Sequence, residues 1–283
     1  MPNDSLLRIV TFNTLFGGHA DDGLGPADWW DAQMAFLCSL RPDVLALQEC
    51  NFFDLLGRRR LHRAVADLDM TRGFLAEANS TTSDHRFHSA ILTGSTVGVV
   101  AEGSDRARYH HVLGWANLVA PGLERPIELR NLHLDPFDPR NRAREVAPLE
   151  VLAAPGRLSL VVGDINTIGL GFPEPDWSQL PAHLLNGHLR APGQGEGSDR
   201  EALELLDRAG FVDASSRFGQ EDVPTAAFGV GDVPRRQDIV LVSPALAPAL
   251  VGYRVHMEPV EKGMSDHAAV SVDLDLSLLG RQE

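Results

Sequence analysis

Apolar residues recur along the chain in short runs that polar residues interrupt, and this pattern predicts both strands and helices. Runs of four to eight apolar or β-branched residues bounded by turn residues are typical of strands. We expect strands at 6–12, 44–47, 73–77, 88–93, 111–119, 127–134, 158–162, 239–242, 253–257 and 268–274. Helical periodicity predicts helices at 26–40, 55–68, 141–153 and 200–209, the last ending at Gly210.

The predicted strands outnumber the helices, and several neighbouring strands are close enough in sequence to form hairpins. This order of elements favours an α/β fold of two packed sheets with helices outside them. The chain has 283 residues, which is long for one domain, but a sandwich with its covering helices can use all of them. We therefore expect a single domain over 1–283.

One segment does not fit this pattern. Residues 169–200 are rich in Gly and Pro and show little periodicity. Long loops of this kind are usually functional or disordered. Two interpretations stay open: an insertion near the mouth of an active site, or a passive surface loop.

The formal net charge of −14 restricts the partners of the chain. Proteins that bind nucleic acid neutralise its phosphates with Lys and Arg, so an acidic chain is not expected to bind DNA tightly without sequence preference. The same charge disfavours anionic membrane surfaces.

Targeting features are not evident in the sequence. Residues 1–9 lack the pattern of a secretory signal, and no apolar run approaches the roughly 18 residues of a membrane span. The two cysteines, Cys38 and Cys50, can form one disulfide at most, which is not a secreted scaffold. We expect a cytoplasmic protein without a membrane anchor.

Polar residues follow the apolar strands repeatedly. Asn13 and Glu49 come just after two predicted strands, and Asp164 with Asn166 follows a third. Others are His133 at the end of a strand and Asp266 with His267 at the start of the last one. Because strand ends cluster at one edge of a sandwich, we expect these side chains to converge on one cleft.

The residue types indicate the chemistry of that cleft. Glu49, Asp164 and Asp266 offer hard oxygen donors, and Asn13 adds a neutral one. Such donors favour Mg²⁺ or Mn²⁺ over zinc. With histidines that transfer protons near neutral pH, this set suits the hydrolysis of a phosphoester. Any one of these residues alone would most often be a solvated or structural group.

Several short motifs resemble, in order, those of the endonuclease/exonuclease/phosphatase superfamily of deoxyribonuclease I-like hydrolases. The matching residues run from residue 8 to about residue 275: Thr11-Phe12-Asn13-Thr14, Leu47-Gln48-Glu49, Asn131-Leu132-His133-Leu134, Gly163-Asp164-Ile165-Asn166-Thr167, Arg236-Gln237-Asp238 and Ser265-Asp266-His267. The resemblance implies a four-layer sandwich of two mostly antiparallel sheets. It also implies a divalent metal, Mg²⁺ or Mn²⁺.

The resemblance implies a role for each matching residue. Glu49 resembles the main metal ligand, with Asn13 and Asp266 in or near the metal shell. Asp164 resembles the residue that orients or deprotonates the attacking water.

The remaining matches resemble groups that contact the phosphate or support such contacts. Asn166 and His133 resemble phosphate donors. Asp238 resembles the partner that holds His267 in one tautomer, and His267 resembles the group on the scissile phosphate. Whether Asp164 or His267 is the base stays open.

The chain departs from the family pattern at Arg236-Gln237-Asp238-Ile239, where the usual motif reads Arg-Ile-Asp-Tyr, and at residues 169–200. Both departures affect the rim of the cleft and therefore the substrate. We expect a small or medium phosphorylated molecule as substrate. The alternatives are a nuclease, a hydrolase of this fold recruited to another bond, and a binding protein without activity.

Overall fold

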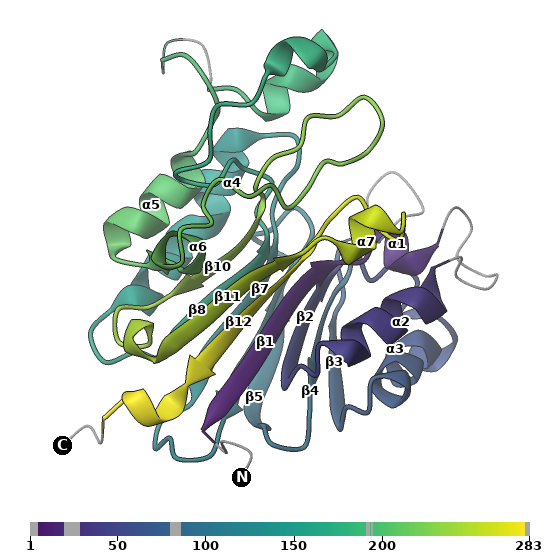
Figure 1. Cartoon of the computed structure of the whole chain (residues 1–283), viewed down its shortest axis with the longest axis vertical. Coiled ribbons are helices and arrows are strands. Elements are labelled where there is room, and N and C mark those ends of the chain that lie inside the picture. Colours follow the sequence, from purple (N-terminus) through teal and green to yellow (C-terminus); the bar gives the residue numbers. More distant parts are fainter. Residues whose placement is uncertain (1–4, 20–28, 80–85, 191–192, 194, 281–283) are drawn as a thin grey trace.

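Two six-stranded sheets pack face to face in the computed structural model, which describes residues 5–19, 29–79, 86–190, 193 and 195–280 (Figure 1). The first sheet has the strand order β11-β12-β1-β2-β4-β3. Its strands are β1 (Leu6–Asn13), β2 (Val44–Gln48), β3 (Arg72–Ala76), β4 (Ser89–Thr93), β11 (Leu250–His256) and β12 (Ala269–Asp275).

The second sheet has the order β5-β6-β7-β8-β10-β9. Its strands are β5 (Gly98–Asp105), β6 (Leu113–Val119), β7 (Ile127–His133), β8 (Ser159–Asp164), β9 (Val212–Asp213) and β10 (Asp238–Val242). Each sheet contains one parallel pair, β1 with β2 and β7 with β8, and its other pairs are antiparallel. The predicted fold, two mostly antiparallel sheets, is confirmed.

The central strands are apolar throughout because they are buried on both faces. In β2, Val44 and Ala46 face the core between the sheets, whereas Leu45 and Leu47 face the helices. The same alternation places Ile9 of β1 between the sheets. Side chains of strands therefore alternate between two separate cores.

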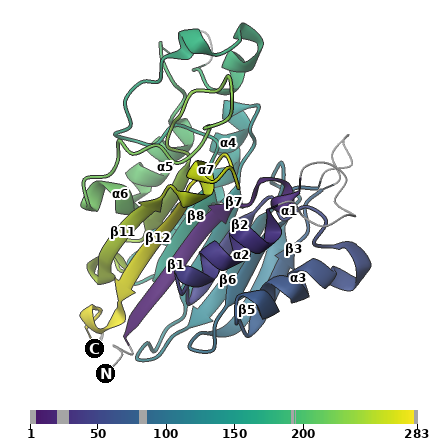
Figure 2. The same cartoon turned by 45° about the vertical axis from the view of Figure 1, so that its right-hand side comes forward.

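Helices cover the outer face of each sheet, which gives four layers (Figure 2). The helices α2 (Trp30–Ser39) and α3 (Leu55–Asp67) pack on the first sheet. On the second sheet lie α4 (Pro139–Val146), the 3₁₀ helix Ala147–Ala153 and α5 (Glu201–Ala209). Shorter helical turns are α1 (Leu15–Gly18), α6 (Ala214–Arg217) and α7 (Glu258–Glu261), together with 3₁₀ turns at Trp177–Gln179, Ala182–Gly187, Ala247–Ala249 and Leu276–Leu278.

Several elements differ from the sequence-based expectation, and the short elements β9, α1, α6 and α7 were not predicted. The segment 141–153 is not one α-helix: it changes to a 3₁₀ helix at Ala147, next to Pro148, which has no N–H to donate. Strand β5 was not predicted, because it is an edge strand whose mostly exposed side chains show no apolar period. The start of the predicted helix 26–40 lies outside the described residues, and α2 is described from Trp30.

Two further expectations concern cysteines and membrane spans. Cys38 and Cys50 are both free thiols, Cys38 exposed and Cys50 buried. Among the helices that the structure describes, none is long and apolar enough to span a bilayer.

Candidate active site

Strand ends bring the predicted polar residues together at one edge of the sandwich. The parallel pairing of β7 with β8 aligns His133 with Asp164, and the antiparallel pairing of β8 with β10 aligns Asp164 with Asp238. In the other sheet, the last residue of β1, Asn13, is aligned with Gln48 of β2. The pairing register of the strands within each sheet therefore places these side chains next to one another.

Asp164 follows a glycine for a steric reason. Gly163 has a φ of 125°, and a Cβ at this position would collide with the backbone carbonyl of Leu132 in the neighbouring strand. Only glycine allows β7 and β8 to approach so closely where β8 delivers the Asp164 carboxylate.

Asn13 joins the two sheets across this edge. Its Nδ2 donates to Asp164 Oδ2 at 3.2 Å and to Glu49 Oε1 at 3.1 Å, while its Oδ1 accepts from the Leu15 amide at 3.1 Å. The Ser265 hydroxyl donates to the Asn13 carbonyl at 2.9 Å and ties the segment before β12 to β1. In this arrangement Asn13 orients two carboxylates.

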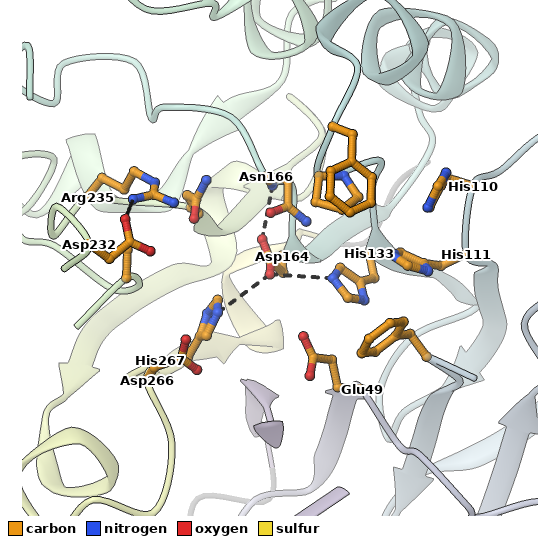
Figure 3. A pocket seen from close by; sticks show the side chains of 15 residues that line it. Glu49, His110, His111, His133, Asp164, Asn166, Asp232, Arg235, Asp266 and His267 are labelled. Carbon is orange, nitrogen blue, oxygen red and sulfur yellow. Dashed lines mark hydrogen bonds and ion pairs between the residues drawn. The ribbon is translucent and has the colours of Figure 1, made fainter. Parts of the chain in front are cut away.

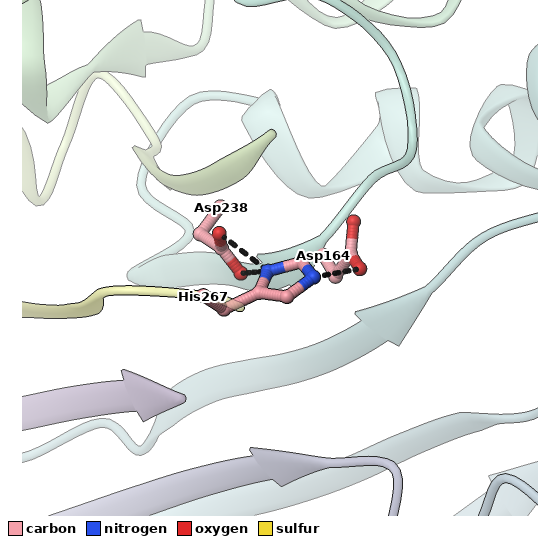
Figure 4. A group of neighbouring side chains, drawn as sticks. All are labelled: Asp164, Asp238 and His267. Atoms are coloured by element: carbon pink, nitrogen blue, oxygen red, sulfur yellow. Dashed lines mark hydrogen bonds and ion pairs between the residues drawn. The ribbon is translucent and has the colours of Figure 1, made fainter. Parts of the chain in front are cut away.

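His267 lies between two aspartates (Figure 4). Its Nδ1 is 2.9 Å from Asp238 Oδ2, and its Nε2 is 3.7 Å from Asp164 Oδ2. Burial lowers the pKa of His267, but the charge and hydrogen bond of Asp238, together with Asp164, raise it well above the ordinary value. The ring is therefore held as a cation, with its position fixed by a buried carboxylate.

Glu49 turns into the cavity directly after β2 through a left-handed backbone conformation, with φ of 53°. The Phe16 amide donates to its Oε2 at 3.0 Å. Burial, with a smaller contribution from the charge of Asp266, raises the pKa of Glu49 to about 7, although the hydrogen bond from Phe16 lowers it. A left-handed conformation in a residue with a side chain stores strain, and such strain is common in functional residues.

The environment of Glu49 and Asp266 fits a divalent cation. Both residues line the same cavity, and Asp266 Oδ1 is buried without a hydrogen-bond partner among the described residues. The charge of Asp266 acts on Glu49, and two such carboxylates, one with a buried oxygen that lacks a partner, are unfavourable unless a cation neutralises them. Hard oxygen donors of this kind suit Mg²⁺ or Mn²⁺.

A second group of donors lies close by. Oxygen or nitrogen atoms of Asp164, Asp238 and His267 all lie within 4.8 Å of one another. Because both ring nitrogens of His267 already face carboxylates, we interpret this group as a hydrogen-bonded relay rather than as a set of metal ligands.

We call the residues at the strand ends around Asp164 and His267 the floor of the cavity. Asn166 and His133 complete this floor. The backbone N–H of Asn166 donates to Asp164 Oδ1 at 3.0 Å, its side-chain Nδ2 donates to the Leu134 carbonyl at 3.0 Å, and its backbone has a φ of 50°. Burial, together with the charge of His267, lowers the pKa of His133 to about 3, so this ring is neutral. Its Nε2 lies 3.7 Å from Asp164 Oδ2.

The cavity above these residues has a volume of about 420 Å³ (Figure 3). Of the predicted site residues, Asn13 and Asp238 support the cavity from behind, and the others line it: Glu49, His133, Asp164, Asn166, Asp266 and His267. The structure thus brings all the predicted site residues together. Their individual chemical roles stay predictions.

Two sides of the rim hold residues that are not among the predicted catalytic and metal-binding residues. On one side are aromatic rings, His110, His111, Phe87 and Phe137, with the His111 and His133 rings stacked at 4.3 Å. On the opposite side of Asp164 lie Arg235 and Asp232 (Figure 3), and Gln237 and Ala227 also line the cavity. In the structure these residues lie outside the named helices and strands. His111 is at the start of the predicted strand 111–119, and Gln237 lies within the Arg236-Gln237-Asp238 motif, but neither signal indicates a place in the rim.

The segment 169–200 is held by packed contacts near its two ends, whereas residues 181–184 in its middle are exposed. Glu174 Oε1 accepts from Trp177 Nε1 at 3.0 Å and from the Ser198 amide at 2.8 Å. In the described part of the segment, no residue lines the cavity. Its approach to the cavity is indirect, through the Trp177 ring, which lies 5.9 Å from the guanidinium carbon of Arg235.

Comparison with solved structures finds the same fold in deoxyribonuclease I-like proteins. An endonuclease/exonuclease/phosphatase family protein from Bacteroides thetaiotaomicron is 16% identical, with a TM-score of 0.62 over 95% of this chain and 97% of that one. One from Beutenbergia cavernae is 18% identical, with a TM-score of 0.64 over 96% of this chain and 72% of the other.

An AP endonuclease from Archaeoglobus fulgidus is also similar, with 18% identity and a TM-score of 0.59 over 95% of this chain and 99% of that one. No protein-family model matches the sequence, and no curated protein matches it. At such low identity the likeness establishes the fold, and the chemistry has to be argued from the site.

Proposed function

We propose that this protein, built on the fold of the endonuclease/exonuclease/phosphatase proteins, is a divalent-metal-dependent phosphoester hydrolase. The observation that carries the proposal is the place of His267, held between Asp238 and Asp164 beside a cavity that Glu49 and Asp266 also line. Phosphoester hydrolysis needs cationic groups where charge develops on oxygen and a group that aligns water. This edge of the sandwich supplies both kinds of group.

Each residue of the floor has a defined task in this proposal. The His267 cation binds a nonbridging oxygen of the phosphate through Nε2. Asp164 aligns a water opposite the leaving oxygen, and Asn166 donates a hydrogen bond to the phosphate. A divalent cation held by Glu49 and Asp266 supplies Lewis-acid stabilisation when it is bound.

We favour a small or medium phosphorylated molecule over nucleic acid as substrate. The net charge of −14 repels a polyanion, and the cavity of about 420 Å³ lies within the range of roughly 300–1,000 Å³ that small-molecule sites occupy. Non-specific binding to duplex DNA is expected to be weak at about 0.15 M salt. Sub-micromolar affinity for duplex DNA in an anisotropy titration would instead favour a nuclease.

The test is a screen of phosphomonoesters, phosphodiesters and plasmid DNA with Mg²⁺ or Mn²⁺. We expect turnover of at least one small ester, loss of that turnover in Asp164→Ala and Glu49→Ala, and loss on chelation. Full activity after exhaustive chelation would contradict the role of the metal. Cleavage of plasmid DNA without cleavage of any small ester would favour the nuclease, and turnover of none of these substrates would contradict the proposal.

A further inference from the structure

Arg235 is a cation at the rim of the cavity that the proposed chemistry does not use. It lines the cavity, yet only 6% of its surface is exposed. Its backbone is fixed by an antiparallel bridge to Ala226, with its amide donating to the Ala226 carbonyl at 3.1 Å. Figure 3 places Arg235 on the side of Asp164 opposite His110 and His111.

The contacts of Arg235 occupy only part of its guanidinium. Nη1 donates to Asp232 Oδ1 at 2.5 Å and to the Val233 carbonyl at 2.9 Å. Nε is buried without a hydrogen-bond partner, and Nη2 donates to no residue that the structure describes. The Trp177 ring packs on the group at 5.9 Å. Nη1 of the guanidinium is therefore held in place. The edge formed by Nε and Nη2 has no partner among the described residues.

The other deeply buried arginines do not share this situation. Arg236 donates to Asp213 and to the Leu170 carbonyl, both at 2.8 Å, and Arg142 donates to the Gly187 carbonyl at 2.8 Å. Each also has one buried nitrogen without a partner, but neither lines the cavity. Arg235 is thus the one of the three placed to meet a ligand.

A buried guanidinium with unpaired donors is costly, and an anion removes that cost. The fork of arginine matches the geometry of phosphate or carboxylate oxygens, and a stacked aromatic ring keeps it oriented. The Trp177 ring also stacks on His188, with a centroid distance of 5.1 Å. Burial, with the charges of Arg235 and Arg142, lowers the pKa of His188 to about 4, so His188 adds no competing charge.

We propose that Arg235 forms a second anion subsite, which binds a phosphate of the substrate other than the one that is cleaved, with Trp177 as its positioning residue. The inference rests on the proposed function, because it takes the scissile phosphate to lie at the floor. The second phosphate can belong to a small molecule or to the next position of a nucleic-acid strand.

The test compares two chromogenic esters that differ in one phosphate: thymidine 5′-(p-nitrophenyl phosphate) and the same compound with an added 3′-phosphate. For the wild type we expect kcat/KM at least tenfold higher for the ester with two phosphates. Arg235→Met should remove most of this preference, mainly through KM, and leave the singly phosphorylated ester within about threefold. Arg235→Lys should keep part of it, because the charge remains but the fork is lost.

Matched variants separate positioning from general charge and from folding. Trp177→Ala should lower the preference, and Trp177→Phe should restore most of it. Arg208→Met, which removes an exposed arginine on α5, should leave the preference for the ester with two phosphates unchanged. Equal losses on both esters in Arg235→Met and Arg235→Lys would mean a structural role and would overturn the proposal, as would a wild type without any preference.

Calorimetric binding of thymidine 3′,5′-bisphosphate and thymidine 5′-monophosphate to the metal-supplemented protein tests the subsite without catalysis. If no ester of the screen is hydrolysed, the proposed function fails, but an Arg235-dependent preference for the bisphosphate still supports the subsite. Equal affinity of wild type and Arg235→Met for the bisphosphate would overturn it. A short oligothymidylate distinguishes the two sources of the second phosphate. If it is cleaved, and Arg235→Met lowers this cleavage by the same factor as it lowers the preference for the ester with two phosphates, the source is a nucleic-acid strand. If it is not cleaved, the source is a small molecule.

Discussion

The floor and the rim of the cavity are built in different ways. At the floor, side chains at strand ends contact side chains from other strands, as Asn13 does with Asp164 and His267 with Asp238. At the rim, the residues come from loops and differ widely in exposure: Phe137 is 73% exposed, whereas Arg235 is 6% exposed. The difference predicts that chemistry and selectivity are separable, because a change in the loops need not disturb the strand register that positions the residues of the floor.

The largest effect is expected from breaking the floor at Asp164. In Asp164→Asn the group that aligns water loses its charge, so kcat/KM should fall about 10³-fold on every substrate, within the range of general acid–base contributions. Steady-state kinetics on two unrelated esters measures this. The control is Asp207→Asn on the exposed face of α5, and a loss confined to one ester would show that floor and rim are not separable.

A second way to break the floor is to remove the partner of His267. In Asp238→Asn the pKa of His267 should fall, because the Asp238 charge and hydrogen bond hold it high. The ring then loses its proton at lower pH, so the alkaline limb of the activity profile should move to lower pH. Turnover near pH 8 should fall about 100-fold.

Kinetics of Asp238→Asn from pH 6 to pH 10 measures this shift. Asp273→Asn, which removes a carboxylate paired with Arg8 at 2.7 Å away from the cavity, is the control. An alkaline limb that stays in place in Asp238→Asn would contradict the role of the pair.

The rim is tested by changing the segment behind it. Replacing residues 175–186 with a Gly/Ser sequence of equal length removes Trp177 but spares Glu174 and Ser198, which hold the ends of the segment. Efficiency on the preferred substrate should fall at least about tenfold, equivalent to roughly 1.4 kcal/mol, while a generic small diester reacts within about threefold. Equal losses would mean that the segment supports the fold, and no loss would make it a passive insertion.

The smallest effect concerns the support of the aromatic side of the rim. Glu145 accepts from the His110 and Asp135 amides at 2.5 and 3.0 Å, and burial raises its pKa to about 7. A carboxyl group whose folded pKa exceeds its unfolded value stabilises the fold most at low pH, and this contribution is lost as pH rises through 7.

Between pH 5 and 8 the Tm of the wild type should therefore fall about 5 °C more than that of Glu145→Gln. Scanning calorimetry across this range checks the slope. The control is Glu150→Gln at an exposed position of the following 3₁₀ helix. Parallel slopes for the wild type and Glu145→Gln would rule out this titration.

The same contrast explains which parts were predictable from the sequence. Asp164 and His133 end apolar strands, so periodicity located both, and the strand register brings them together. Arg235 lies in a loop that has no period, and its contact with Trp177 joins residues far apart in the sequence. Strand β5 was missed for a related reason: hydrogen bonds to β6 rather than burial hold it.

The pairing of β1 with β12 has a consequence for how the protein is made. Leu6 is aligned with Asp275, so β1 has to wait for β12, which is synthesised much later, before its ladder of hydrogen bonds is complete. Such distant pairings close slowly and leave unpaired strand edges exposed in the meantime. Ser265 and Asn13, which are far apart in the sequence, meet only after this closure, so the candidate site is not assembled before synthesis has passed β12.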